Sequence, residues 1–354
     1  MAGRFLGSSV GIACVLFACG PPGETVASGK PPAPPGDGSS PTSQTRTFAM
    51  RTVLLGDTHR NGVAAGWAWQ DYGFDIDDHY TTKYSLDTCR LTSGAPISVQ
   101  VDGSLGVDNS WGASVLRQLQ PLMQTSQPSQ LASSWIAQGK GTLEIVVTGL
   151  SDVPRQRILG LTAQVFRGGV YPGAPAFDLS TSWPVLASSL ADGQSLAGGA
   201  ATAFANAYST DGVFVSGATD GVIVVDLGVA GDVPLSLTIH HPILALTLDA
   251  DGSRTGVLPT DALAGILAGV LDPDEVRDAW MKVQSASKLL CADGIDAASL
   301  KQELSQDQDI FSDGTNGPPG MCSGISIGLG FTVARVANPT EVQADPQPPP
   351  PCSQ

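Results

Sequence analysis

Carboxylates gather in two short stretches of the sequence and could together bind a hard cation. The first stretch is Asp75-Ile76-Asp77-Asp78, with Asp57 upstream, and the second covers residues 102–109. Calcium takes six to eight oxygen ligands, which acidic loops with glycine turns supply readily. Neither stretch is an EF-hand, because the regular acidic start and the closing Glu are missing. The candidate ligands for calcium are Asp75, Asp77, Asp78, Asp102, Asp108 and Asn109.

A second interpretation of the same residues is structural. Asp, Asn and Gly are the residues that turns prefer, and Asp108 or Asn109 can help to begin the helix that follows. A third interpretation is catalytic, because glycosidases need only two suitably spaced acids, for which Asp75, Asp77 and Asp108 are available. The sequence leaves these three interpretations open.

Histidine and serine patterns give little support to hydrolysis by a Ser-His pair. The four histidines are His59, His79, His240 and His241, and the last two, as neighbours on a strand, point to opposite faces. The Gly-x-Ser-x-Gly spelling occurs at residues 7–11 and 324–328, but neither copy joins a strand to a helix. The hydrolase order requires a histidine after the nucleophilic serine, but no histidine follows Ser326 in the sequence. We therefore assign no catalytic residue.

Aromatic residues offer another binding surface. Trp67 and Trp69 share one face of an expected strand over residues 66–69, so both side chains are buried or both are exposed. With Trp111 they could form a platform for sugars, but packing in the core is the more common fate of Trp beside apolar residues. We favour the core.

Four cysteines lie beyond the N-terminal segment, namely Cys89, Cys291, Cys322 and Cys352. An even number of cysteines in an oxidising compartment predicts two disulfides. We favour a Cys291–Cys322 bond, because these two flank one loop-rich segment. Cys89 would then bond to Cys352, or Cys352 would stay free. No CxxC pair occurs, which removes thioredoxin-like and zinc-ribbon sites from consideration.

The N-terminal residues predict export. Arg4 precedes an uncharged run from Phe5 to Ala18, which is too short to span a bilayer and is typical of a signal peptide. Its end, Leu16-Phe17-Ala18-Cys19-Gly20, resembles the lipobox of bacterial lipoproteins. The resemblance implies cleavage before Cys19 and a diacylglyceryl group on its thiol. The alternative is an ordinary signal peptide with Cys19 as a plain thiol.

Composition divides the chain into four parts. Residues 1–18 are the signal peptide, and residues 19–46, rich in Pro, Gly and Ser, form a tether behind Cys19. Residues 47–337 form one large globular domain, and residues 338–354 form a Pro-rich flexible tail. The formal net charge of −15 repels phosphate backbones and anionic lipids. We therefore expect no nucleic-acid partner, and a membrane partner reached through the lipid anchor only.

The globular part reads as mainly β. Strands rich in Val, Ile, Leu and Thr are expected over residues 48–56, 66–69, 141–149, 158–167, 212–216, 221–227, 235–248, 262–270 and 326–333. Asp211-Gly212, Asp220-Gly221 and Asp251-Gly252 predict hairpin turns. The run over 262–270 is also compatible with a helix, but the new helix that begins at Asp272 favours a strand. Pro242 predicts an edge or a bulge in its strand. Ser110, Ser129 and Asp272 are expected caps of helices, and the helical segment near 273–304 comprises one helix to about residue 290 and a shorter one over 297–304. We predict an antiparallel two-sheet β-sandwich with a few flanking helices.

The globular part also resembles uncharacterised lipoproteins of large-genome, high-GC bacteria. The resemblance lies in residues 55–58, 68–75, 106–112 and 322–331 and spans most of residues 50–333. It implies a single co-extensive domain and no particular activity.

Two functions follow as hypotheses. The first is an exported lipoprotein, anchored in the outer membrane or at the cell surface, with a non-catalytic binding or envelope role and an unknown ligand. The second is a secreted carbohydrate-active hydrolase with paired carboxylates.

Overall fold

The computed structural model describes residues 30–34, 36, 38–120, 123, 125–151, 156–217, 219–229, 233–248, 263–286 and 297–347. Several predictions therefore fall outside the described residues. They concern the signal peptide, the lipidated Cys19, most of the tether, the turn at Asp251-Gly252, the predicted end of the first late helix near 290, and the residues Cys291 and Cys352.

The described part of the chain is mainly β, as predicted, and contains one large antiparallel sheet. Nine strands pair in the order β6-β5-β3-β2-β1-β10-β9-β8-β7. Their bounds are β1 Thr45–Leu54, β2 Leu143–Thr148, β3 Ile158–Arg167, β5 Thr202–Thr210, β6 Val213–Val215, β7 Ile223–Gly228, β8 Pro234–Thr247, β9 Leu263–Leu271 and β10 Ile325–Val336. A small parallel pair, β4 (Val185–Leu186) with β11 (Val342–Gln343), lies beside it.

The large sheet closes on itself. β6 pairs with β5 through Tyr208↔Val215 and also with β8 through Val215↔Ala245. The C-terminal end of β8 thereby pairs with β6. The N-terminal half of β8 pairs with β7, for example through Ile223↔Ile239. The expected two-sheet sandwich is not confirmed, because the described strands form one continuous hydrogen-bonded circuit. Alternation along a strand shows which residues face inward, but not whether the inner faces belong to one curved sheet or to two.

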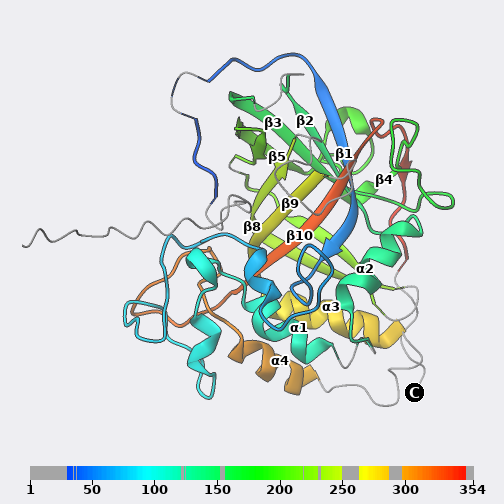
Figure 1. Cartoon of the computed structure of the whole chain (residues 1–354). Coiled ribbons are helices and arrows are strands. Elements are labelled where there is room, and N and C mark those ends of the chain that lie inside the picture. Colours follow the sequence, from blue (N-terminus) through cyan, green and yellow to red (C-terminus); the bar gives the residue numbers. More distant parts are fainter. Residues whose placement is uncertain are drawn as a thin grey trace, which may run out of the picture.

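Four α-helices gather at one end of the sheet (Figure 1). They are α1 (Leu116–Leu119), α2 (Pro128–Ala137), α3 (Pro273–Ala286) and α4 (Ala297–Gln306). α2 packs against β1 and β7, α3 packs against β8, and α4 packs against α3. Among the described helices none is both long and apolar enough to cross a membrane.

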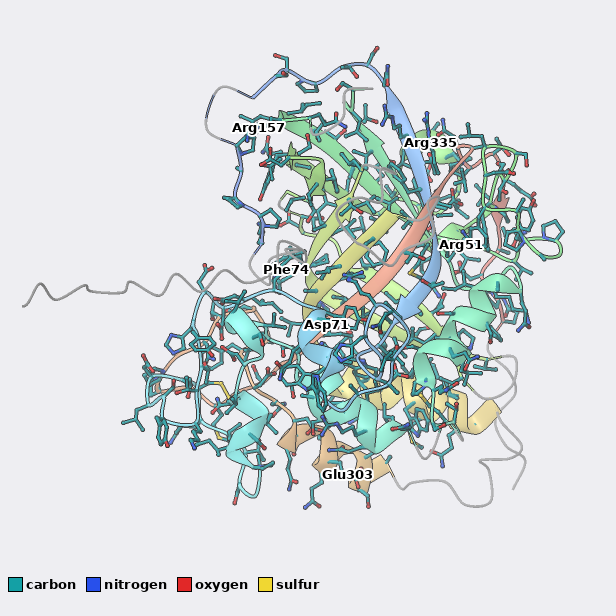
Figure 2. The ribbon with its side chains drawn as sticks, viewed as in Figure 1. Arg51, Asp71, Phe74, Arg157, Glu303 and Arg335 are labelled. Atoms are coloured by element: carbon teal, nitrogen blue, oxygen red, sulfur yellow. A yellow bond between two sulfur atoms is a disulfide. The ribbon has the colours of Figure 1, made fainter. Side chains whose placement is uncertain are left out.

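Both faces of the central strands are buried. The inner face and the helices form one large apolar cluster that includes Leu267, Phe331 and Trp280. The outer face of β9 carries Ile266 and Ala268, and these pack against Phe74 from the long segment between β1 and β2. Phe74 is drawn where this segment meets the sheet (Figure 2). The long β1–β2 connection therefore covers the outer face instead of extending into solvent.

Most predicted elements are confirmed, and the caps are confirmed in part. Asp272 accepts hydrogen bonds from the amides of Asp274 (2.7 Å) and Glu275 (3.3 Å) at the start of α3, as predicted. Pro242 lies at a register shift in the β8–β9 pairing, between His240 and Ile243, as the sequence indicated. The expected Ser110 cap is wrong: the side chain of Asn109 accepts the Gly112 amide at 3.0 Å instead.

Other local predictions are wrong. Residues Ala68–Asp71 form a 3-10 helix, so Trp67 and Trp69 do not share a strand face. Ser129 does not precede α2 but is its second residue. Its backbone amide donates a hydrogen bond to the Asp57 carboxylate at 3.2 Å. Asp220-Gly221 does not join two paired strands, because β6 and β7 have no mutual pairing.

The predicted ends of the globular part also differ from the structure. The predicted tail contributes β11, and the predicted tether already contacts the sheet through a Ser39↔Ile158 bridge. Pro and Gly content identified both stretches as unable to build a core, but it did not exclude their packing along the edge of one.

Candidate functional site

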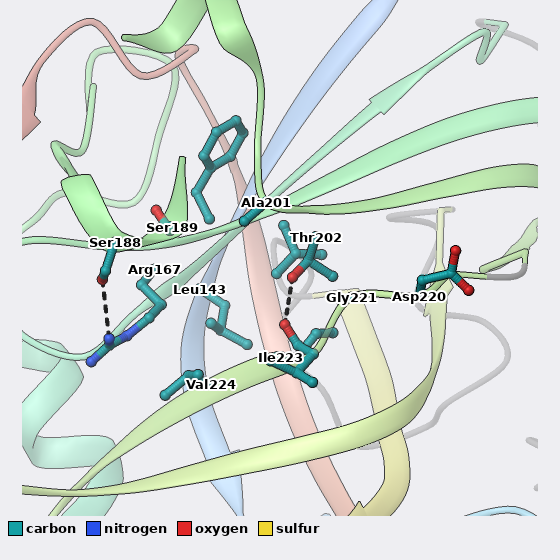
Figure 3. Close-up of a pocket in the computed structure, with 13 residues that line it drawn as sticks. Leu143, Arg167, Ser188, Ser189, Ala201, Thr202, Asp220, Gly221, Ile223 and Val224 are labelled. Atoms are coloured by element: carbon teal, nitrogen blue, oxygen red, sulfur yellow. Dashed lines mark hydrogen bonds between the residues drawn. The ribbon is translucent and has the colours of Figure 1, made fainter. Parts of the chain in front are cut away.

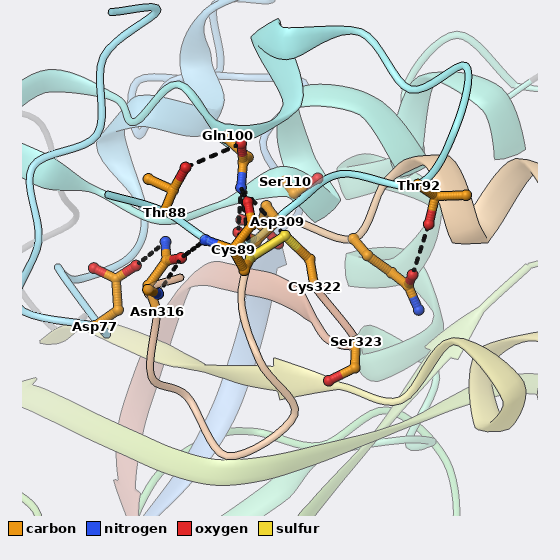
Figure 4. The surroundings of a disulfide bond; sticks show 12 residues. Asp77, Thr88, Cys89, Thr92, Gln100, Ser110, Asp309, Asn316, Cys322 and Ser323 are labelled. Carbon is orange, nitrogen blue, oxygen red and sulfur yellow. Dashed lines mark hydrogen bonds between the residues drawn. A yellow bond between two sulfur atoms is a disulfide. The ribbon is translucent and has the colours of Figure 1, made fainter. Parts of the chain in front are cut away.

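Two segments far apart in the sequence form a lobe on the outer face of β9 and β10. One is the region around residues 72–109, and the other is the loop of residues 307–324 before β10. Cys89 and Cys322, 233 residues apart, join them by a disulfide with a Cα–Cα distance of 5.1 Å. The buried amide of Gln100 donates to the Cys89 carbonyl at 2.8 Å beside this bond (Figure 4). The lobe thus has a fixed frame around its polar groups.

Three of the predicted ligands meet inside this lobe. One carboxylate oxygen from each of Asp75, Asp77 and Asp108 lies within 4.8 Å of the others. Asp108 is buried, and its Oδ2 accepts the Ile76 amide at 2.6 Å. Asp75 and Asp77 both accept the His79 amide, at 3.0 and 2.8 Å. These contacts fix the three carboxylates, which we call the aspartate trio, around a common point.

The trio lies in surroundings that disfavour negative charge. Burial raises the pKa of Asp75 and of Asp77. Burial, and then repulsion from Asp77 and Asp102, raises the pKa of Asp108 well above its usual range. Burial also raises the pKa of Asp102, which accepts a hydrogen bond from the Thr81 amide, to about 7. A divalent cation at the common point would remove this repulsion without requiring protons.

Two other predicted ligands are placed differently. Asp78 is not a member of the trio and adopts the left-handed backbone conformation, with φ of 56°. Asn109 is used structurally: its Nδ2 donates to the carbonyls of Trp69, Tyr72 and Gly328, and its Oδ1 accepts the Gly328 amide at 3.0 Å. Asn109 therefore attaches the lobe to β10, and this supports the structural interpretation for that residue.

Three histidines pair with carboxylates, each in a separate place. His59 lies 2.5 Å from Asp71, and His79 lies 3.3 Å from Asp87. His240 lies 2.9 Å from Glu275 at the start of α3. These exposed or half-exposed pairs are surface contacts, and each contributes little to stability.

Ser326 is the second residue of β10 and is fully buried. Its hydroxyl donates to Asp309 at 2.5 Å and accepts the Ser110 amide at 2.8 Å. The second Gly-x-Ser-x-Gly spelling is therefore part of a strand, and its serine ties the lobe to the sheet.

The tryptophans have different environments. Trp69 and Trp111 are buried, whereas 64% of the Trp67 surface is exposed. The expectation that Trp67 and Trp69 would be buried together is wrong, because the 3-10 turn separates them. A three-tryptophan platform is not formed.

The favoured Cys291–Cys322 pairing is wrong, because Cys322 bonds to Cys89. Sequence proximity favoured the short loop, but a disulfide needs only that the two Cα atoms approach within about 7 Å. Folding of the β1–β2 connection onto β10 supplies that approach.

Three buried carboxyl groups have no counterpart among the predicted sites. Burial raises the pKa of Asp309 to about 8 and that of Asp307 to about 6. Glu144 on β2 is fully buried, its two carboxylate oxygens have no hydrogen-bond partner in the described part of the chain, and burial raises its pKa. In the sequence, Glu144 occupies a polar position of an alternating strand, which normally indicates exposure, so no local pattern identifies it.

Comparisons with protein-family models, with characterised proteins and with solved structures find no significant match to this chain.

Proposed function

We propose that the protein is an exported, lipid-anchored envelope protein whose body has a non-catalytic binding role and holds a divalent cation, calcium by preference, at the aspartate trio. The anchor rests on the lipobox-like residues Leu16 to Gly20 and the tether that follows them. The Cys89–Cys322 disulfide supports export, because such bonds persist in oxidising compartments.

The convergence of Asp75, Asp77 and Asp108 carries the cation proposal. Three carboxylates within 4.8 Å of one another repel strongly in half-buried surroundings. A hard cation with oxygen ligands at about 2.3–2.6 Å offsets this repulsion. Asp102, beside the trio, could supply a further oxygen.

The hydrolase alternative has less support from the same geometry. Carboxylate oxygens within 4.8 Å of one another are closer than the roughly 6.5–9.5 Å that an inverting glycosidase needs to admit water, but they are near the roughly 5–5.5 Å of a retaining one, so the spacing argues against inversion only. Asp108 also lies buried beneath backbone amides, where a sugar ring cannot reach it.

The cation proposal is tested by calorimetric unfolding of the purified protein in calcium and then in chelator. Calcium at about one hundred times its dissociation constant should stabilise the protein by about 2.7 kcal/mol. Asp77→Asn should abolish the increase in Tm. Asp78→Asn is the matched control, since it removes the same charge from the same loop and Asn tolerates the left-handed backbone. A wild-type Tm that is equal in calcium and chelator would refute the proposal.

The anchor is tested separately, by phase partition of the expressed protein in detergent. Cys19→Ser should move the protein from the detergent phase to the aqueous phase, while Cys14→Ser, inside the export segment, should leave it in detergent. Retention of the Cys19→Ser variant in detergent would exclude lipidation at this residue as the anchor.

A further inference from the structure

Outside the closed circuit of strands, β7 lies near the end of β3 without pairing with it, which leaves a gap between these two strands. The pairing of β3 with β5 ends at Val165↔Thr202, two residues before β3 itself ends. On the other side, β7 is the last strand of the sheet order and pairs with β8. Two contacts bridge the gap: the Thr202 hydroxyl donates to the Val222 carbonyl, and the Arg167 guanidinium lies 2.8 Å from the Asp226 carboxylate.

A pocket of about 290 Å³ lies in this gap (Figure 3). Leu143, Val165 and Ile223, which belong to the inner core of the sheet, form its apolar wall. Ser188, Ser189 and Thr202 are hydroxyl-bearing residues of its lining. The pocket therefore combines an apolar interior with a polar side.

We propose that this pocket binds a small neutral molecule with an apolar body and a hydrogen-bond donor at one end, such as an alkylated phenol. An apolar cavity of about 150 Å³ accepts benzene, so a pocket of 290 Å³ accepts a molecule of roughly twice that size. Apolar walls with a few placed polar groups are the usual design of small-molecule sites.

The charges around the pocket disfavour an anionic ligand. Arg167 is paired with Asp226 through two short hydrogen bonds of 2.8 and 2.9 Å, so its charge is already balanced. Asp226 is further bound by the Ser236 hydroxyl at 2.6 Å. Asp220, which is exposed in the lining, would repel an anionic ligand.

The hydroxyl groups select a donor. The Ser189 proton is given to the Leu186 carbonyl at 2.7 Å, and the Thr202 proton is given to the Val222 carbonyl. The Ser188 proton is given to the Asp345 carboxylate. The Ser188 oxygen already accepts a hydrogen bond from Arg167 Nη1 at 3.3 Å. The Ser189 and Thr202 oxygens, whose protons are already donated, can only accept further hydrogen bonds, and a ligand must bring the hydrogen.

This inference does not depend on the proposed cation site, because the pocket and the aspartate trio use different residues. The test uses the full chain and three probes with the same 4-propylphenyl body: 4-propylphenol, 4-propylanisole and 4-propylbenzoate. Saturation-transfer NMR titrations should show binding of the phenol, with at least tenfold weaker binding of the ether, which lacks the donor, and of the anion.

Two exposed alanines supply a matched pair of variants. Ala201 lines the pocket, while Ala203, two residues further along the chain, does not. Ala201→Trp should weaken binding of 4-propylphenol at least tenfold, and Ala203→Trp should leave it unchanged. Thr202→Val removes an acceptor at nearly constant volume and should reduce the preference for the phenol over the ether.

Three results would overturn the inference. They are no saturation transfer to 4-propylphenol at millimolar concentration, equal binding of the three probes, or equal losses in Ala201→Trp and Ala203→Trp when both variants keep the wild-type Tm.

Discussion

At the scale of single residues, buried polar side chains that make several hydrogen bonds each hold the lobe to the sheet. Asn109 makes three donated and two accepted hydrogen bonds between the lobe, the next turn and β10. Ser326 and Asp309 form a second link of the same kind. Buried polar networks of this sort specify one arrangement, because losing a single partner leaves others without hydrogen bonds.

Asp309 should make stability fall as the pH rises. Its pKa is raised to about 8 by burial, whereas the unfolded chain has a pKa of about 4. The folded state therefore holds the proton more tightly, and this stabilisation is fully present below pH 4 and is lost as the pH rises through 8.

Urea unfolding between pH 4 and 8, in chelator, measures this effect. The free energy of unfolding of wild type should decline relative to Asp309→Asn by a few kcal/mol, since one pKa unit corresponds to about 1.4 kcal/mol. Parallel pH profiles of the two proteins would contradict the assignment.

Glu144 should cost stability at neutral pH. Its carboxyl group is buried without a partner in the described part of the chain. Replacing it with Met, which has a similar length and no polar atom, should raise the free energy of unfolding by about 1–3 kcal/mol. Glu144→Gln keeps a polar group in the same place and should gain less. A loss of stability in the Met variant would indicate an unseen role for the carboxyl group.

At the scale of elements, β10 is a central strand that contacts both its neighbours in the sheet and the lobe. It pairs with β1 and β9 and is buried on both faces. Its glycines leave room for the lobe, because a Cβ at Gly328 would lie 2.3 Å from the Tyr72 carbonyl and one at Gly330 would lie 2.3 Å from the Tyr72 ring. The glycine alternation in this strand is thus a packing requirement.

Gly330→Ala should therefore destabilise the protein by at least about 1–3 kcal/mol, the usual cost of an overpacked site. Gly66→Ala is the control, because a Cβ there meets nothing within 4 Å. Thermal unfolding of the two variants should separate them clearly. Equal Tm values would mean that the lobe shifts freely on β10.

At the scale of the whole molecule, the disulfide closes a long covalent loop. Cys89 and Cys322 are separated by 233 residues, and every strand of the large sheet except β1 and β10 lies between them in the sequence. Cross-links over long loops restrict the unfolded chain strongly. The bond therefore stabilises the attachment of the lobe and the fold as a whole.

Cys89→Ser combined with Cys322→Ser should lower the free energy of unfolding by about 2–5 kcal/mol. Chemical denaturation measures this loss, and reduction of the wild type should approach the same value. A double variant as stable as the oxidised wild type would show that packing alone fixes the lobe.

Much of the secondary structure followed from local patterns. β3 and β8 were predicted to within a residue, and the ambiguous run that became β9 was assigned correctly because a capped helix begins directly after it. Alternation of apolar residues and an Asp-Pro helix start are local properties, so they can be recognised in the sequence without knowledge of the tertiary structure. The regrouping of Asp75, Asp77 and Asp108 was likewise anticipated as a cation hypothesis, since loop acids 30 residues apart can meet in one turn-rich segment.

Tertiary structure alone decided the rest. The closure of the sheet, the Cys89–Cys322 bond and the gap that forms the pocket all depend on contacts between segments far apart in the sequence. The burial of Glu144 depends on which face of β2 another segment covers, and the burial of Asp309 depends on the packing of its loop against β10. Local sequence determines the direction in which a side chain points relative to its own backbone. Which distant segment packs against that side chain is decided by the free energy of burial in the folded protein.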